Sequence, residues 1–384
     1  MANNLLQKIK ALRHLVWLGV WRRMPLKKNK IILWADNFKS FGCSPKYIAT
    51  WLARECPGKY DLVWVLERGR PIPEGLPEGI RFVRYFSMQY LKEIATAKVI
   101  ICNHRTGPYH YFQKRKGQYY IQTWHSSLRL KKIEGDAPLL EPEYVAYAKS
   151  DSQKIDLLLS GCRFSSHIFR RAFWYDGEIL ECGTPRCDGF FRDAELVREK
   201  VFSFYGIPKG KKLALYAPTF RKDGKPSLYG FSPEAMAQSL GGDWVIGCRL
   251  HPNLAGSVDT GCGLDMTGYP DMQELLQGCD LLVTDYSSSM FDMAIAGKAC
   301  ILYMPDLKAY QEKERGLYFD VTALPFPKAE TMDALCQCMA SWDKEGYKKD
   351  LQAFCQQIGS FEKGTAAQAV AQRLETICFG RIEE

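Results

Sequence analysis

The sequence predicts an α/β protein of two doubly wound domains that face each other across a cleft. Its 384 residues exceed what one hydrophobic core usually organises. Along both halves, short apolar runs alternate with helical patterns, which is typical of parallel sheets covered by helices on both faces. Ligands of such sheets bind beyond the carboxyl ends of the strands. We therefore expect the functional residues where strands end.

Strand-like runs and helical patterns alternate at regular intervals. The expected strands cover residues 30–35, 60–66, 80–85, 98–103, 119–124, 178–181, 212–216, 244–249, 281–284 and 300–303. Helices are expected over 44–55 with Ser44 as cap, 87–97 with Ser87 as cap, 150–160, 165–173 and 195–205, from about 232, 272, 287 and 308, and over 365–377. The last of these is expected to cross back and brace the first domain. The expected domains are residues 29–200 and 201–384.

Residues 1–28 predict a basic amphipathic helix that associates with a membrane. Apolar residues lie at helical spacing, with lysines and arginines among and after them. The longest uninterrupted apolar run, 15–21, is far shorter than the ~20 residues that span a bilayer. Such a helix suits the headgroups of an anionic membrane, here at its cytoplasmic face. The same pattern also fits a helix packed on the body of the protein.

The composition narrows the class of partner. A net charge of +9 favours phosphorylated substrates, an anionic membrane or nucleic acid. Because the basic residues are spread along the chain and no RNA-binding signature occurs, a nucleic-acid partner is not expected. The 14 cysteines lie singly and predict buried free thiols in a reducing compartment. Their spacing does not match a zinc site, so no metal site is expected.

Two histidines close strand-like runs and are the predicted catalytic residues. His125 ends the run 118–125, and His251 ends the run 244–251. Each could simply be satisfied by a backbone group at a strand end. However, Arg249 lies two residues before His251 on the same strand face, and two cationic groups aimed at one place fit a phosphate. A histidine with a near-neutral pKa also serves as a general base.

A hydroxyl-rich turn follows the run 281–284 and opens a helix. One serine would suffice to cap that helix, so the additional hydroxyls indicate a diphosphate site. Asp285 is expected to orient the turn and Asp292 to reach a ribose hydroxyl. Arg221 follows another strand end and is expected to join the same site, although its pattern also fits a solvent-exposed arginine in a loop. The predicted donor-binding residues are Thr219, Arg221, Arg249, Thr284, Asp285, Ser287, Ser288, Ser289 and Asp292.

A second group of residues is expected on the acceptor side of the cleft. Lys131 and Lys132 could contact an anionic substrate, but they also fit a solvent-exposed face. The turn 183–186 carries one basic residue, which alone does not define a site. The predicted acceptor-side residues are Ser126, Ser127, Lys131, Lys132 and Arg186.

Together these segments resemble the CDP-glycerol glycerophosphotransferase family, the teichoic acid primases and polymerases with a GT-B fold of two Rossmann-like domains. The chain departs from the family pattern at Ser126, where glycine is usual, and at Cys187, where asparagine is usual. The matching stretches are 122–125, 130–133, 183–186 with Asp188, 216–219 with Arg221, 249–252, 284–288 with 291–292, and 315–320.

The resemblance implies transfer of glycerol phosphate, or a similar polyol phosphate, from a CDP-activated donor to a hydroxyl of a polyprenyl-linked or cell-surface glycan acceptor, with release of CMP. His125 would be the base, and His251 would contact the donor phosphates. No resident cofactor is expected, and a divalent ion brought by the substrate stays open. The alternatives are a GT-B glycosyltransferase or nucleotide-sugar epimerase that uses a UDP-sugar, and a non-catalytic protein that binds a membrane or nucleic acid.

Overall fold

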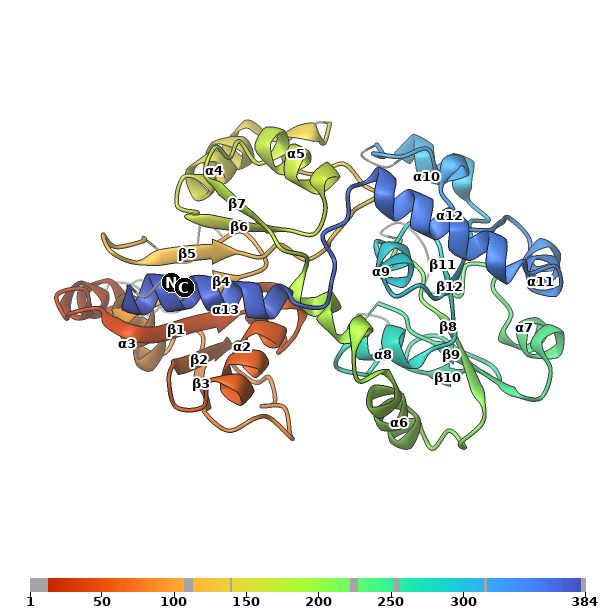
Figure 1. Ribbon diagram of the computed structural model, residues 1–384, viewed down its shortest axis with the longest axis horizontal. Coiled ribbons are helices and arrows are strands. Elements are labelled where there is room, and N and C mark those ends of the chain that lie inside the picture. Colours follow the sequence, from red (N-terminus) through yellow and green to blue (C-terminus); the bar gives the residue numbers. More distant parts are fainter. Residues whose placement is uncertain are drawn as a thin grey trace, which may run out of the picture.

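The computed structural model describes residues 13–106, 113–138, 140–221, 227–251, 256–313 and 316–380. These residues form two lobes, each a parallel sheet with helices on both faces (Figure 1). We call the lobe around β1–β7 the first lobe and the lobe around β8–β13 the second lobe. The prediction of two doubly wound halves is confirmed. Residues 1–12 of the expected amphipathic helix, and Pro252 and Arg315 of the motifs, lie outside the described residues.

The first lobe contains a sheet of strand order β3-β2-β1-β4-β5-β6-β7, in which all neighbours are parallel. The order reverses between β1 and β4, and such a reversal opens a crevice at the carboxyl ends of the two strands. The strands are β1 (Lys27–Trp34), β2 (Asp61–Leu66), β3 (Ile80–Arg84), β4 (Ala97–Cys102), β5 (Tyr119–Gln122), β6 (Leu157–Ser160) and β7 (Glu178–Glu181).

Helices cover both faces of this sheet. Because side chains alternate along a strand, Ile32 of β1 packs in the layer shared with α3 and α5, whereas Ile31 packs in the layer shared with α2 and α13. The helices of this lobe are α2 (Cys43–Glu55), α3 (Met88–Thr96), α4 (Pro142–Ser152), α5 (Arg163–Ala172) and α13 (Ala366–Phe379), with the 3-10 turns η1 (Asp36–Phe38), η2 (Glu134–Asp136) and η3 (Pro185–Phe191).

The second lobe repeats the plan with the strand order β10-β9-β8-β11-β12-β13, again all parallel. Its order reverses between β8 and β11. The strands are β8 (Lys212–Tyr216), β9 (Trp244–Cys248), β10 (Leu264–Asp265), β11 (Leu281–Thr284), β12 (Ala299–Tyr303) and β13 (Lys328–Ala329). The helices are α6 (Ala194–Tyr205), α7 (Pro233–Leu240), α8 (Met272–Gly278), α9 (Ser289–Ile295), α10 (Leu307–Lys313), α11 (Met332–Ala340) and α12 (Lys344–Gln357), with the 3-10 turn η5 (Val321–Ala323).

The chain returns from α12 to the first lobe, where α13 lies beside α2 and β1 (Figure 1). The carboxylate of Asp188 accepts hydrogen bonds from the backbone amides of Ala366 at 3.0 Å and Ala367 at 2.8 Å, at the start of α13. In the crossing segment, Glu362 accepts a bond from the Thr184 amide at 3.0 Å. The expected bracing of the first domain by the last helix is confirmed.

Some expected elements differ from the structure. The expected helix over 150–160 is wrong beyond Ser152, because 157–160 forms the buried strand β6. A continuous apolar run covered on both faces has no alternation, so it does not distinguish a buried strand from a helix. The strands β10 and β13 and the helices α11 and α12 are not among the elements expected from the sequence.

Of the two predicted helix caps, Ser87 is confirmed, because its side chain accepts a bond from the Tyr90 amide. Ser232, where a helix was expected to begin, also acts as a cap and accepts a bond from the Ala235 amide. Ser44 is not a cap, because α2 begins one residue earlier, after Gly42. The prediction of free cysteines is confirmed: all fourteen are free, half of them are buried, and only Cys262 is exposed.

Leu374 tests the contribution of α13 to the first lobe. Its side chain is fully buried in the layer that contains Ile31 and Leu33 of β1. We expect Leu374→Ala to lower the free energy of unfolding by about 2–5 kcal/mol because it leaves a cavity there. Urea unfolding measures this, with the exposed Gln368→Ala as the matched control, expected within about 0.5 kcal/mol of wild type. Equal stability of the two variants would contradict the bracing role.

Candidate active site

Between the lobes lies a cleft of about 410 Å³, lined by residues of both. This volume is within the usual range for small-molecule sites. His125 comes from the first lobe and His251 from the second, and both line the cleft. The predicted residues found in its lining are His125, Ser126, Lys131, Arg186, Thr219, Arg249, His251, Ser287, Ser288, Ser289 and Asp292.

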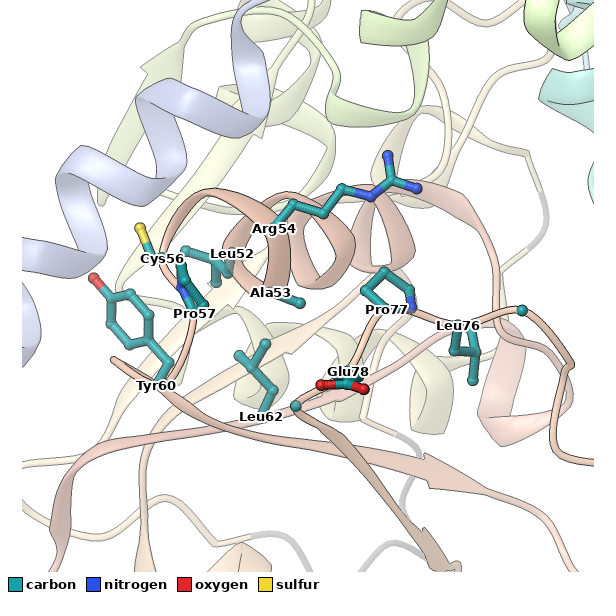
Figure 2. Close-up of a pocket in the computed structure, with 13 residues that line it drawn as sticks. Leu52, Ala53, Arg54, Cys56, Pro57, Tyr60, Leu62, Leu76, Pro77 and Glu78 are labelled. Atoms are coloured by element: carbon teal, nitrogen blue, oxygen red, sulfur yellow. The ribbon is translucent and has the colours of Figure 1, made fainter.

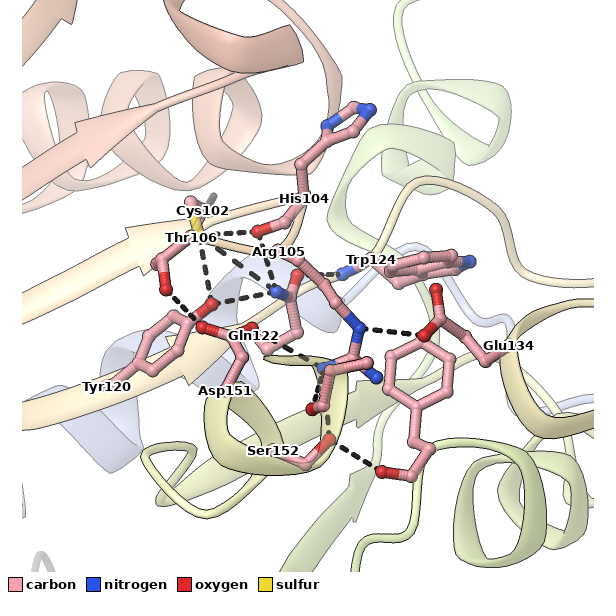
Figure 3. A network of polar contacts seen from close by, with 12 residues as sticks. Cys102, His104, Arg105, Thr106, Tyr120, Gln122, Trp124, Glu134, Asp151 and Ser152 are labelled. Atoms are coloured by element: carbon pink, nitrogen blue, oxygen red, sulfur yellow. Dashed lines mark hydrogen bonds and ion pairs between the residues drawn. The ribbon is translucent and has the colours of Figure 1, made fainter. Parts of the chain in front are cut away.

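The wall from the first lobe is built at the carboxyl ends of β4 and β5. The side chain of Gln122 joins these two ends (Figure 3). Its Nε2 donates to the His104 carbonyl oxygen at 2.9 Å and to the Tyr120 hydroxyl at 2.9 Å, and its Oε1 accepts from the Trp124 amide at 2.9 Å. Trp124 has a left-handed backbone with φ of 51°, which non-glycine residues rarely adopt. Gln122 therefore helps to fix the turn that presents His125.

A buried ionic network lies behind this wall (Figure 3). Arg105 donates to Glu134 at 2.8 Å, to Asp151 at 3.4 Å and to the Ser152 hydroxyl at 3.0 Å. The hydroxyl of Thr106 donates to the same Asp151 carboxylate. Because Arg105 follows β4 directly, its bonds hold the segment next to His104 against α4 and η2.

The hydrogen bonding of His125 fixes its tautomer. Its Nδ1 lies 3.3 Å from the carbonyl oxygen of Asn103, which can only accept, so Nδ1 carries the proton and Nε2 keeps a free electron pair. The ring stacks on that of His104 at a centroid distance of 5.0 Å. Burial, followed by the charges of His104, Arg129 and Arg186, lowers the pKa of His125 well below its ordinary value. The imidazole is therefore neutral at pH 7 and able to accept a proton.

The wall from the second lobe carries the serine turn that follows β11. Ser287, Ser288 and Ser289 all line the cleft, and the Ser289 hydroxyl lies 2.9 Å from that of Ser287. Three neighbouring hydroxyls are suited to donate to the oxygen atoms of a phosphate.

Two basic side chains follow β9 on the same wall. Arg249 is held in place because its Nη1 donates to the carbonyl oxygens of Met266 at 3.1 Å and Tyr269 at 2.7 Å. His251 is exposed, and its ring lies 4.8 Å from that of Phe220. Partial burial, and then the charge of Lys39 from the first lobe, lower the pKa of His251.

A buried ion pair joins the lobes at the cleft. Nη2 of Arg186 lies 2.6 Å from both carboxylate oxygens of Asp292, and Gln273 donates to the same carboxylate at 3.0 Å. Although burial opposes it, the Asp292 carboxylate raises the pKa of Arg186 above its ordinary value. Asp292 was expected to reach a ribose hydroxyl. In this structure its oxygens are already engaged, so it ties the lobes together at the edge of the cleft.

Three predicted donor-site residues lie behind the cleft wall and support it. Arg221 donates to Asp285 at 2.8 Å and to Asp306 at 2.9 Å, so its guanidinium is paired with two carboxylates. Asp285 also accepts from the Thr219 amide at 2.8 Å, which links its turn to the segment after β8. The Thr284 hydroxyl donates to a carbonyl at the end of β8, at 2.7 Å.

Two predicted acceptor-side residues also do not line the cleft. Ser127 is buried, and its carbonyl oxygen accepts from the Ser165 hydroxyl at 2.6 Å. Lys132 pairs through its backbone with Gly316 of the second lobe, at 3.0 Å. The lining also contains residues that were not predicted from the sequence, among them Trp124, Arg129, Phe220, Met272 and Tyr286. Arg129 lies close to Lys131 and Lys132 in the sequence, and this cluster of basic residues was the signal that could have identified it.

A second cavity, of about 520 Å³, lies between the end of α2 and the segment before β3 (Figure 2). Its lining is mostly apolar, with Arg54 and Glu78 as its charged residues, and it contains no residue of the second lobe. Tyr60 and Leu62 place it at the amino end of β2, whereas ligands of parallel sheets bind at carboxyl ends. We therefore assign the candidate active site to the cleft.

No three His, Cys, Asp or Glu side chains gather into a possible metal site in the part of the chain that the structure describes.

The two-lobed fold and the cleft lined by basic and hydroxyl side chains are typical of an enzyme, and comparison identifies the family. The model of CDP-glycerol:poly(glycerophosphate) glycerophosphotransferases matches residues 18–376, and the chain belongs to this family.

Curated relatives agree with this assignment. The chain is 31% identical to the teichoic acid glycerol-phosphate transferase of Staphylococcus aureus, over 90% of this chain and 93% of that protein. It is 28% identical to a teichoic acid poly(glycerol phosphate) polymerase of Bacillus spizizenii, over 97% of this chain and all of that protein. It is also 29% identical to the polymerase of Bacillus subtilis, over 85% of this chain but only 45% of that protein. The chain thus spans about half the length of some relatives.

Solved structures show the same architecture. The wall teichoic acid polymerase TagF superposes with a TM-score of 0.86 at 27% identity, covering 98% of this chain and 99% of that one. The GT-B-like fold expected from the resemblance is thereby confirmed. A putative UDP-N-acetylglucosamine 2-epimerase from Listeria monocytogenes, at 12% identity and a TM-score of 0.51, shares the fold alone.

The ion pair between the lobes gives a stability prediction. We expect Arg186→Met to lower the free energy of unfolding by about 3–5 kcal/mol, because it leaves the Asp292 carboxylate buried without its cation. The double variant with Asp292→Leu should recover much of this loss, since both charges are then absent. Urea unfolding measures both. The matched control is Arg192→Met, whose side chain is 46% exposed and which should cost about 1 kcal/mol or less.

Proposed function

We propose that this protein transfers glycerol phosphate, or a similar polyol phosphate, from a CDP-activated donor to a hydroxyl of a teichoic acid-type acceptor and releases CMP. The observation that carries the proposal is a neutral histidine with a free Nε2, in a chain of this family, facing a serine turn and two basic groups across one cleft. His125 is the proposed base. The serine turn, Arg249 and His251 are the proposed donor site.

The chemistry follows from these positions. Nε2 of His125 accepts the proton of the acceptor hydroxyl while that oxygen bonds to the β-phosphorus of the donor. The bond from this phosphorus to the oxygen shared with the CMP phosphate breaks, and CMP leaves with the electron pair. Negative charge grows on the leaving phosphate, where Arg249, His251 and the serine hydroxyls stabilise it.

The runner-up, sugar transfer or epimerisation with a UDP-sugar, is not favoured. The basic and hydroxyl side chains of the cleft would suit any diphosphate donor, but the family match and the relatives covered over nearly their whole length concern glycerol-phosphate transfer. The structural likeness to an epimerase extends to the fold alone.

His125 tests the reaction. We expect purified protein to release CMP from CDP-glycerol when a lipid- or glycan-linked acceptor is present, and His125→Asn to slow this release by about 10²–10⁴-fold. The exposed His167→Asn serves as the matched control, at wild-type rate.

The pH dependence of the same reaction follows from the lowered pKa of His125. Above its pKa the imidazole is neutral and can accept a proton, and below it the base is lost. We therefore expect kcat/KM to stay level as pH falls from 8 to about 6.5, the ordinary histidine value, and to decline only at lower pH.

Release of UDP from UDP-sugars without any turnover of CDP-glycerol or CDP-ribitol would contradict the proposed donor.

We also propose that the protein works at the cytoplasmic face of the membrane, held by its amino-terminal helix. In the described part of this segment, residues 13–21 are helical. Leu18 packs in the core of the first lobe, whereas Val16 and Val20 on the same helix are 58% and 42% exposed. Leu15 and Trp17 are exposed as well. None of the described helices is long and apolar enough to span a bilayer.

Membrane attachment is tested with the exposed face alone. We expect Val16→Glu combined with Val20→Glu to move the protein from sedimenting anionic liposomes to the supernatant, because it removes apolar contact and adds negative charge. Leu196→Glu, at a 67% exposed apolar position of the second lobe, is the matched control and should sediment like wild type. Equal sedimentation of all three proteins would refute this attachment.

A further inference from the structure

Arg129 is a buried cation in the cleft that the proposed reaction leaves unused. Only 4% of its surface is exposed, yet it lines the cleft in the turn that also presents His125. Its Nη2 donates to the Ser126 carbonyl oxygen at 3.2 Å. Its Nε and Nη1 are buried and have no hydrogen-bond partner among the described residues.

Among the described residues that line the cleft, no carboxylate balances this charge. The lining contains the basic side chains of Arg129, Lys131, Arg186 and Arg249, but Asp292 is its one carboxylate, and that is paired with Arg186. The guanidinium of Arg129 instead lies over the ring of Phe169, 4.5 Å from its centroid. A cation–π contact offsets only part of the cost of burying a charge.

The guanidinium keeps its proton under these conditions. Burial lowers the pKa of Arg129 to about 10, which still leaves it charged at neutral pH. A buried cation with two unsatisfied donors is expensive, so such an arrangement usually has a partner that the protein alone does not contain. The free N–H donors of a buried guanidinium suit the oxygens of a phosphate, with which they make charge-assisted hydrogen bonds.

We propose that Arg129 binds a phosphate group of a substrate beside His125. The identity of the substrate rests on the proposed function, whereas the binding of an anion at Arg129 is argued from the structure alone. Arg129 belongs to the first lobe, opposite the serine turn, Arg249 and His251 that we assign to the donor. Relatives are named for poly(glycerol phosphate), whose units each carry a phosphate close to the next hydroxyl. The phosphate at Arg129 is accordingly assigned to the acceptor, and the β-phosphate of the donor is the other source.

Calorimetric titration of the full chain separates these sources without requiring turnover. Glycerol 3-phosphate represents the acceptor end and CDP the donor diphosphate. We expect wild type to bind glycerol 3-phosphate with CDP already bound, and Arg129→Met to weaken this binding by roughly tenfold or more, as loss of charged hydrogen bonds does. The exposed Arg68→Gln is the matched control and should bind like wild type.

If Arg129→Met instead weakens CDP and leaves glycerol 3-phosphate unchanged, the phosphate belongs to the donor and the acceptor assignment is wrong. If both ligands bind Arg129→Met as they bind wild type, the proposal is overturned. Failure of wild type to bind CDP or to turn over CDP-glycerol would count against the proposed function, while Arg129-dependent binding of glycerol 3-phosphate would still support the phosphate site.

Thermal unfolding distinguishes this role from a structural one. Since Arg129→Met removes a buried, unbalanced charge, we expect its Tm without ligand to be no lower than that of wild type. Glycerol 3-phosphate should raise the Tm of wild type and of Arg68→Gln but not that of Arg129→Met. Arg129→Lys, which keeps the positive charge but lacks the guanidinium group, should retain part of this rise in Tm. A fall in Tm with an unchanged ligand response would show that Arg129 only supports the fold.

Discussion

The site depends on one constraint, the parallel direction of every strand in both sheets. Parallel strands end at the same edge of a sheet, so the turns that follow them meet there however far apart they lie in the chain. In the first lobe this edge gathers Asn103, His104 and His125. In the second lobe it gathers Arg249, His251 and the serine turn at 287–289. Because the two edges face each other, residues of both lobes line one cleft.

The lobes are fastened to each other beside this cleft by three kinds of contact. The buried pair of Arg186 and Asp292 joins them electrostatically. Leu128 and Leu130, which follow His125, pack in the apolar core of the second lobe, and Lys131 pairs with Leu317 through an isolated bridge. The turn that presents the proposed base is therefore attached to both lobes. These contacts fix the position of the proposed base relative to the proposed donor site.

The electrostatics of the cleft explain why an anionic substrate belongs there. Among the described residues of the lining, basic side chains outnumber the single carboxylate, so the cleft attracts anions such as phosphate. Burial, and then the charges of His104, Arg129 and Arg186, lower the pKa of His125 and keep it neutral. Two cations at the cleft thus contribute to keeping the proposed base in the form that accepts a proton.

The sequence by itself determined the alternation of strands and helices, the strand ends at His125 and His251, and the hydroxyl-rich turn, because these follow from local patterns of apolar residues and caps. It could not distinguish β6 from a helix, since a strand buried on both faces shows no alternation. It also could not separate residues that line the cleft from those that support it. Arg221 and Thr284 resemble ligands in the sequence, but Asp306 and the end of β8 occupy their polar groups. Only the tertiary structure decides this, because hydrogen-bond partners distant in the chain determine which side chains stay available. For the same reason, the sequence could not show that the guanidinium of Arg129 is buried with unsatisfied donors.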